Sequence, residues 1–148
     1  MSARVLYELA GRAAAITRNT ATKLLINDRF DIARAAGADG VQLTEHSLPP
    51  SIVREICDLD SLIGVSTHSL ETAQSAAHAG ADFVVFGPVF ETESKSAYGP
   101  PQGLEKLREV CDALAGFPVL AIGGINAGNA EECFGAGASG IAGISLFQ

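Results

Sequence analysis

The amino-acid sequence predicts an α/β fold: one domain over residues 1–148 that forms an incomplete TIM (β/α)8 barrel with six parallel strands. The main observation is a repeated phrase of alanine and glycine, which occurs at 36–41, 79–84 and 136–141. Each copy follows a helical pattern and precedes a short apolar run. Glycine readily adopts the left-handed conformation that ends a helix, so each copy indicates a helix, a tight turn and a buried strand. Repeats of this unit give a mostly parallel sheet.

The predicted strands are short apolar runs without clean alternation, which is typical of parallel strands buried on both faces. They lie at 23–26, 40–43, 62–66, 83–86, 119–122 and 140–145. Helical periodicity predicts helices before and between them, at 3–18, 29–36, 51–58, 70–79, 103–115 and 129–134. Ser2 and Ser69 are suited to cap two of these helices. The apolar face expected for the first helix consists of Val5, Leu6, Leu9, Ala13 and Ile16.

Two architectures accommodate six parallel strands: an open doubly wound sheet, or a barrel that lacks part of itself. A dinucleotide-binding doubly wound domain carries a GxGxxG phrase after an early strand, and this sequence has none there. The chain also opens on a helix and stops just after a strand. We therefore expect a barrel whose first two strands and last helix are missing.

Composition limits the classes of partner. The 148 residues are 47% apolar and 18% charged, which is enough apolar material for a folded core. Ten basic against seventeen acidic side chains give a net charge of −7, which argues against a nucleic-acid or membrane surface. The three cysteines are far apart, and neither a signal peptide nor a membrane-spanning run is found. We therefore expect a cytoplasmic protein.

The functional residues of such a fold lie at the carboxyl ends of its strands. Gly123 and Gly124 follow a strand there, and their backbone amides, with those near Ser145 after the last strand, could face a phosphate. A sharp turn between strand and helix, without a ligand, is the alternative.

The connection at 87–103 is long for a loop between a strand and a helix. Thr92 and Lys95 in this loop offer a hydroxyl and an ammonium to an anionic group. The alternative is a solvated loop with an incidental charge.

Three further polar residues follow strands. Asp28 is either a ligand for a hard cation or the N-cap of the next helix, and local pattern alone favours the cap. For His46 and His68, a structural role and a catalytic role stay equally open. Cys133 lies on an apolar helix face, which indicates a core position.

Five phrases in the same order resemble the thiamine-phosphate synthase family, which includes the related thiazole tautomerases. Any one of these phrases is weak, whereas the ordered set covers nearly the whole chain. The phrases are 24–29, 39–43, 64–69, 86–90 with Thr92 and Lys95, and 121–125.

The resemblance implies a transferase of thiamine biosynthesis that joins hydroxymethylpyrimidine diphosphate to thiazole phosphate and releases pyrophosphate. It implies an Mg²⁺ cofactor held by Asp28 and a catalytic role for Lys95. Asn27 would belong to the substrate-binding residues. By matching position, Ser66, Thr92 and Lys95 would hold the pyrophosphate, and the thiazole phosphate would be held by Gly123, Gly124 and Ser145.

The sequence departs from both branches of the family. Ser47 stands where the synthases have their second metal-binding carboxylate, so Mg²⁺ binding would be weak unless Glu45 substitutes. Pro88 stands where the tautomerases carry a histidine. The alternatives are therefore a metal-free isomerase like the tautomerases, or a barrel fragment that binds a phosphate without catalysis.

The missing strands would leave the edges at 23–26 and 140–145 unpaired. Because exposed apolar edges promote association, we expect a homo-oligomer.

Overall fold

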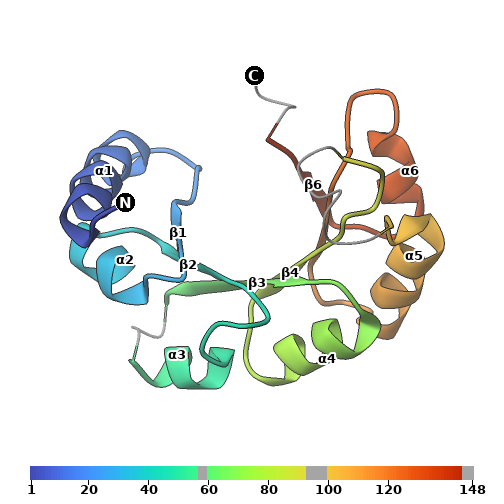
Figure 1. The fold of residues 1–148 in the computed structure, drawn as a ribbon, viewed down its shortest axis with the longest axis horizontal. Helices are drawn as coiled ribbons and strands as arrows, with labels where there is room; N and C mark the ends of the chain where they lie inside the picture. The colour runs from blue at the N-terminus through green and yellow to red at the C-terminus, as the bar shows by residue number, and fades with distance from the viewer. Residues whose placement is uncertain (57–59, 93–99, 145–148) are drawn as a thin grey trace.

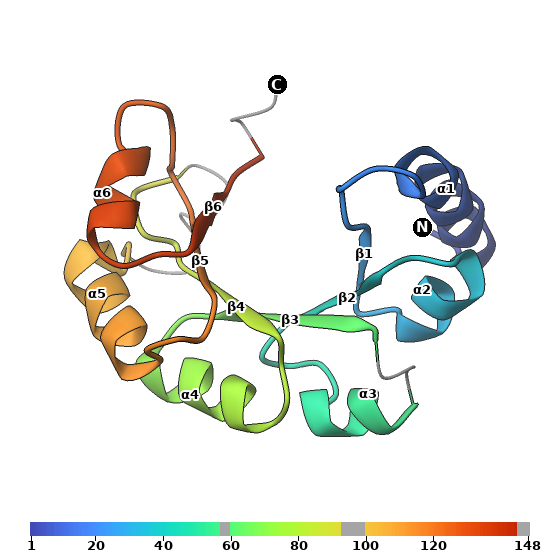
Figure 2. The same cartoon turned by 180° about the vertical axis from the view of Figure 1, so that it is seen from behind.

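The computed structural model describes residues 1–56, 60–92 and 100–144. Six parallel strands form one sheet in the order β1-β2-β3-β4-β5-β6. The sheet curls into a half-barrel with the helices on its outer side, and β1 and β6 lie on opposite sides of the opening (Figures 1 and 2). The strands are β1 Leu25–Asn27, β2 Gly40–Leu43, β3 Leu62–Thr67, β4 Phe83–Phe86, β5 Val119–Ile122 and β6 Gly140–Ala142.

Helices precede and alternate with the strands. They are α1 Ala3–Thr17, α2 Phe30–Ala36, α3 Pro50–Ile56, α4 Leu70–His78, α5 Gly103–Ala113 and α6 Ala130–Gly135. Each strand pairs with its sequence neighbour, so the order never reverses as it does in a doubly wound sheet. The predicted parallel α/β barrel architecture is therefore confirmed, and element ends either match the prediction or differ from it by at most three residues. Within the described residues, no helix has the length and apolar character needed to cross a membrane.

Both predicted N-caps are confirmed. The Ser2 hydroxyl accepts a hydrogen bond from the N–H of Val5 at 3.4 Å. Ser69 and Thr72 form a reciprocal capping box at the start of α4. These caps satisfy backbone donors that the first turn of a helix leaves unpaired.

The repeated alanine and glycine phrase ends three helices, as predicted. Gly37, Gly80 and Gly137 have φ angles of +70°, +92° and +98°, which glycine adopts without a steric penalty. The polar residue two positions after each glycine then forms hydrogen bonds to the start of the preceding strand. The N–H of Asp39 donates to the Leu24 carbonyl at 2.8 Å, and the Asp39 carboxylate accepts from the Leu24 N–H at 2.9 Å.

The second copy repeats this two-way contact, which we call the aspartate clamp. The N–H of Asp82 donates to the Ile63 carbonyl at 2.8 Å, and its carboxylate accepts from the Ile63 N–H at 2.7 Å. In the third copy Ser139 keeps the backbone half, donating to the Val119 carbonyl at 2.8 Å. Each clamp therefore sets the register of a strand against the preceding strand at the amino end of the sheet.

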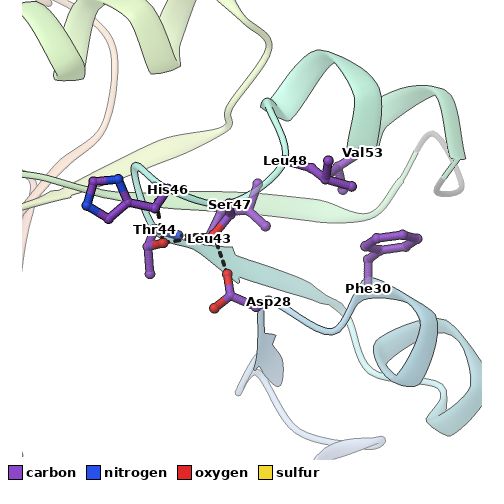
Figure 3. A pocket seen from close by; sticks show the side chains of 8 residues that line it. All are labelled: Asp28, Phe30, Leu43, Thr44, His46, Ser47, Leu48 and Val53. Atoms are coloured by element: carbon purple, nitrogen blue, oxygen red, sulfur yellow. Dashed lines mark hydrogen bonds between the residues drawn. The ribbon is translucent and has the colours of Figure 1, made fainter.

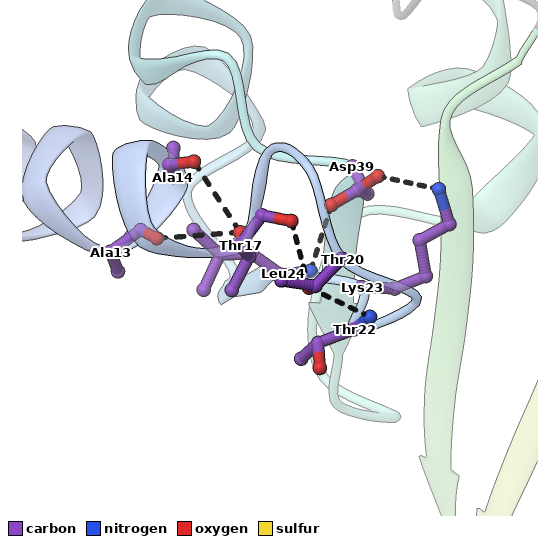
Figure 4. Close-up of polar contacts among 8 residues, drawn as sticks. All are labelled: Ala13, Ala14, Thr17, Thr20, Thr22, Lys23, Leu24 and Asp39. Atoms are coloured by element: carbon purple, nitrogen blue, oxygen red, sulfur yellow. Dashed lines mark hydrogen bonds and ion pairs between the residues drawn. The ribbon is translucent and has the colours of Figure 1, made fainter.

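A basic side chain completes each aspartate clamp. The Lys23 ammonium lies 2.9 Å from the Asp39 carboxylate, as Figure 4 shows. The Arg54 guanidinium lies 2.7 Å from the Asp82 carboxylate and also donates to the carbonyls of Ser61 and Gly80. The Leu24 N–H and, to a smaller extent, the Lys23 ammonium hold the pKa of Asp39 below its usual value.

The two faces of the sheet differ in burial. Ile63, Val84 and Phe86 point toward the helices and are fully buried. Alternate residues, such as Leu62 and Phe83, point to the concave side and are only half-buried. The prediction of strands buried on both faces is thus right for the convex side and wrong for much of the concave side.

Helix α1 packs through a face that only partly matches the one expected: Leu6 and Ala13 are partly buried as predicted, and the other three residues are not. Ala10 and Ala14 are buried against the rest of the fold, with Leu6 beside them, whereas Val5, Leu9 and Ile16 are 45%, 44% and 78% exposed. Small alanine side chains allow α1 to approach α2 closely, and the bulkier residues are left outside this contact.

Replacing Asp39 by Asn tests the aspartate clamp. At pH 7 we expect Asp39→Asn to lower the free energy of unfolding by about 1 kcal/mol, because the amide loses the charge that Leu24 N–H and Lys23 recognise. The folded-state pKa of Asp39 lies below the ordinary 3.8, so this stabilisation is present above pH 3.8 and is lost as the pH falls through the folded value.

Urea unfolding of the variant and the parent chain at pH 7 and at pH 3 measures the difference. Asp112→Asn on the exposed side of α5 is the matched control, and it should leave stability unchanged. A difference for Asp39→Asn that is as large at pH 3 as at pH 7 would show that its charge does not stabilise the sheet.

Candidate functional site

The carboxyl ends of all six strands lie at one edge of the sheet, because the strands are parallel. Asn27 ends β1, Ser66 lies next to the end of β3, and Gly123 and Gly124 follow β5. Thr92 is half-buried. Two predicted site residues, Lys95 and Ser145, lie outside the described residues.

Asp28 is not the N-cap of α2. Arg29 occupies that position, and no side-chain hydrogen bond caps the helix. Asp28 instead has a φ of +55°, which aspartate tolerates better than most residues, and its N–H donates to the Gln42 carbonyl at 3.0 Å. Its carboxylate accepts a hydrogen bond from the Ser47 hydroxyl (Figure 3). The local cap prediction is wrong because this partner is 19 residues away in the sequence.

The Ser47 hydroxyl belongs to a compact turn between β2 and α3. It accepts a hydrogen bond from the Thr44 N–H at 2.8 Å and lies 2.9 Å from the Thr44 hydroxyl. Asp28, Thr44 and Ser47 line one wall of a hollow, and Phe30 and Val53 line another part of it. The hollow therefore presents oxygen atoms beside an apolar surface.

The donor set at Asp28 fits a hard cation only in part. Carboxylate and hydroxyl oxygens are ligands of the type that Mg²⁺ takes, and Mg²⁺ is commonly held by one or two carboxylates plus substrate phosphates. No group of three or more His, Cys, Asp or Glu side chains suited to a metal occurs among the described residues. Asp28 supplies one charged group, and a cation there needs oxygen atoms from a phosphorylated ligand.

Gln42 belongs to this edge but was missed by the sequence analysis. Its side-chain amide donates to the Ser66 hydroxyl at 3.0 Å across two neighbouring strands. Gly64 makes room for it, because a Cβ at that position would lie 2.3 Å from the Gln42 side-chain oxygen. The available signal was a polar residue within an otherwise apolar strand. Among the residues that the structure describes, the Ser66 hydroxyl donates to no acceptor, so its hydrogen is available to a ligand.

Gly123 and Gly124 form the sharp turn that follows β5, with φ angles of +101° and +64°. Their carbonyls accept hydrogen bonds from the Phe90 N–H and the Asn129 amide, both at 3.0 Å. Across the described part of the chain, the N–H groups of the two glycines have no hydrogen-bond partner. These two donors are available to an acceptor at the carboxyl edge.

The glycine pair also supports the segment that leads to Thr92. A Cβ on Gly124 would lie 2.3 Å from the Glu91 carbonyl oxygen, and a Cβ on Gly123 would lie 2.5 Å from the Pro88 Cβ. The glycines are therefore required by packing as well as by backbone conformation. This contact places Thr92, the residue after Glu91, next to the Gly123-Gly124 turn.

The two histidines that follow strands, His46 and His68, have different surroundings. The His68 ring donates from Nδ1 to the Gly87 carbonyl, since a carbonyl oxygen can only accept. This bond ties the segment after β3 to the segment after β4, which favours the structural reading of His68. His46 is exposed, and its ring points away from the carboxylate of Asp28 (Figure 3).

Cys133 is fully buried, which confirms its predicted core position. Burial raises the pKa of both Cys111 and Cys133. A raised pKa suppresses the reactive thiolate, so these two thiols are unsuited to nucleophilic chemistry.

The curled parallel sheet defines the class as a (β/α)-barrel protein. Proteins of this class have their sites at the carboxyl ends of the strands, where the polar groups described above lie. The model of the thiamine monophosphate synthase family matches residues 1–147. The chain belongs to this family.

Relatives and solved structures agree with this assignment. A protein of Geobacter sulfurreducens, provisionally named a thiamine-phosphate synthase, is 47% identical over 98% of this chain and 68% of its own length. The thiamine-phosphate synthase of Methanocella arvoryzae is 47% identical over 82% of this chain and 57% of its own length. The thiamine phosphate pyrophosphorylase of Pyrococcus furiosus superimposes with a TM-score of 0.85 at 37% identity, over 97% of this chain and 67% of that one. This chain thus spans only part of the relatives it matches.

Adding one methyl group to Gly124 tests its packing role. Gly116→Ala is the matched control, because Gly116 has a φ of +85° with no neighbouring atom within 4 Å of an added Cβ. The control should lose about 1–2 kcal/mol of stability from backbone strain alone. Gly124→Ala should lose more, because its Cβ also displaces the Glu91 carbonyl. Urea unfolding measures both, and equal losses would contradict the packing role of Gly124.

Proposed function

We propose that this chain acts in thiamine biosynthesis as a transferase that joins hydroxymethylpyrimidine diphosphate to thiazole phosphate. The bond between the pyrimidine methylene carbon and pyrophosphate oxygen breaks, and pyrophosphate leaves with the bonding electrons. The thiazole nitrogen then forms a bond to the same methylene carbon. The enzyme must therefore stabilise negative charge on the leaving group.

The observation that carries the proposal is the pairing of two unlike groups at one edge of the sheet. At β1, Asp28 presents a carboxylate that suits a hard cation. At the end of β5, Gly123 and Gly124 present N–H groups without a partner in the described residues, and such groups suit a phosphate. A reaction between two phosphorylated molecules, one of them a diphosphate, uses both kinds of group. Family membership supports the same reaction.

We assign the substrate-binding roles from the position of each residue at the carboxyl edge of the sheet. We assign the thiazole phosphate to the amides of Gly123 and Gly124, with Ser145 completing the site. The Ser66 hydroxyl, oriented by Gln42, donates to the pyrophosphate. Thr92 donates to the same group, and Asn27 at the end of β1 contacts the substrate.

Lys95 is assigned the central catalytic role. Its ammonium would neutralise the charge that grows on pyrophosphate as the carbon–oxygen bond breaks.

We assign Mg²⁺ to Asp28, with the remaining ligands supplied by water and the substrate's phosphate oxygens. When bound, the ion supplies positive charge that stabilises the departing pyrophosphate. Because Ser47 is neutral, Asp28 is the only charged group assigned to the ion, so we expect weak binding before the diphosphate arrives.

The second candidate is a metal-free isomerase like the tautomerases. The Asp28 carboxylate favours the transferase over it, because this group suits the cation that the transferase uses. Pro88 does not supply the histidine expected of a tautomerase, and the His68 ring is hydrogen-bonded to the Gly87 carbonyl.

The cytoplasmic location and the homo-oligomer stay predictions. The exposed Val5, Leu9 and Ile16 on α1 support association of the chain.

Substitution of Lys95 tests the proposed reaction. We expect Lys95→Ala to lower kcat by about 100-fold with a smaller rise in KM, because the charge it stabilises develops mainly in the transition state. Lys106→Ala on α5 is the matched control and should retain activity, since Lys106 contacts the side chain of Gln102. The assay is release of pyrophosphate together with formation of thiamine phosphate. A parent chain that yields neither product would favour the non-catalytic alternative.

The metal assignment makes opposite predictions for two neighbouring residues. Asp28→Asn should raise the Mg²⁺ concentration required for half-maximal activity by about tenfold or more, because the charged ligand is lost. Ser47→Asp should lower that concentration by about tenfold, because it adds a second carboxylate beside Asp28. Mg²⁺ titrations of pyrophosphate release measure both changes.

Ser139→Asp is the control for added charge, because it places a carboxylate at the amino edge of the sheet. It should leave the Mg²⁺ requirement unchanged. Isomerase activity on thiazole phosphates that is unaffected by Asp28→Asn and Ser47→Asp would instead support the metal-free reading.

A further inference from the structure

We infer that Ser47 is a positioning residue for Asp28: its hydroxyl holds one carboxylate oxygen, does not itself bind the cation, and leaves the other carboxylate oxygen as the cation ligand. This inference rests on the proposed function, since it concerns the same cation. It assigns Ser47 a different role from the carboxylate ligand that the family pattern implies at this position.

The first step is the bonding capacity of the Ser47 hydroxyl. A hydroxyl has one hydrogen and two lone pairs. Ser47 uses its hydrogen on the Asp28 carboxylate and one lone pair on the Thr44 N–H, which lies 2.8 Å away. The Thr44 hydroxyl lies 2.9 Å from Ser47 and takes the second lone pair. With all three positions in use, the Ser47 oxygen has no lone pair left for a metal.

The second step is the direction of the hydrogen bonds. Because Ser47 spends its only hydrogen on Asp28, the Thr44 hydroxyl must be the donor in their mutual contact. The Thr44 oxygen in turn accepts from the His46 N–H at 3.3 Å. Backbone N–H groups can only donate, so they orient the whole chain of bonds toward the Asp28 carboxylate.

The third step concerns the geometry of Asp28 itself. Its backbone is held by the bond from its N–H to the Gln42 carbonyl at 3.0 Å. One carboxylate oxygen accepts from Ser47, and the other has no partner in the described part of the chain. Asp28 thus offers one open oxygen in a constrained orientation.

A single open carboxylate oxygen has a consequence for the order of binding. Mg²⁺ requires near-octahedral oxygen coordination, and the other ligands at this site must come from water or the diphosphate. Cation and diphosphate should therefore bind cooperatively, and each must raise the affinity for the other by the same factor.

Binding of Mn²⁺ as a paramagnetic probe tests this inference without turnover. Electron paramagnetic resonance measures free Mn²⁺, and water-proton relaxation counts the water molecules on the bound ion. We expect Ser47→Ala to weaken Mn²⁺ binding about three- to tenfold, the range of one hydrogen bond, with the same number of bound waters. Ser47→Thr should restore the affinity, and inorganic pyrophosphate should tighten Mn²⁺ binding to the parent chain.

Ser69→Ala is the matched control for a purely structural effect, because Ser69 caps α4. It should lower stability without changing Mn²⁺ affinity. Thr44→Val keeps Ser47 but removes the hydroxyl that donates to it, and should weaken Mn²⁺ binding by a smaller factor than Ser47→Ala.

Three results would overturn the inference. One additional bound water in Ser47→Ala would identify Ser47 as a ligand. An unchanged affinity in Ser47→Ala would remove its positioning role, and a parent chain that does not bind Mn²⁺ even with pyrophosphate would remove the cation site. Pyrophosphate release, assayed in parallel, tests the transferase separately, since the Mn²⁺ measurements require no thiazole phosphate and no reaction.

Discussion

The register of the parallel strands is the constraint on which the rest of this structure depends. Asp39 and Asp82 each clamp the amino end of one strand to its neighbour through a backbone bond and a carboxylate bond. A shift of one residue would move every side chain to the other face of the sheet. Because the strands are parallel, fixing their amino ends also aligns their carboxyl ends, where Asn27, Ser66 and Gly123 lie.

The candidate site has two parts with different physical origins. At β1 and β2, Asp28 is oriented by a hydrogen bond from a turn, and the cation-binding role that we propose for it depends on charge. At β4 and β5, the Gly123-Gly124 turn is shaped by close packing against the segment that ends at Glu91, and the phosphate-binding role that we propose for it depends on backbone N–H groups. Gln42 and Ser66 lie between these parts on neighbouring strands. Polar groups from elements far apart in the sequence thus share one edge.

Much of the fold could be predicted because its signals are local. The glycine-ended helices, the Ser69 cap and the apolar strands depend on residues within a few positions of one another, where propensity and hydrogen bonding act directly. The prediction was wrong where tertiary packing determined which side chains are buried. Helix α1 buries Ala10 and Ala14, because a close approach to α2 favours small side chains over the larger Val5, Leu9 and Ile16.

The sequence by itself determined the order of elements, the parallel topology and the family, because periodic patterns and ordered phrases survive without knowledge of contacts. Only the tertiary structure decided which partner each site residue has. Asp28 has the sequence context of a helix cap, yet it faces Ser47 across the turn between β2 and α3. Gly124 has the sequence context of a ligand-facing turn, yet it also lies against Glu91. Such contacts depend on how strands and loops are arranged in space, and local sequence patterns do not specify which residues come into contact.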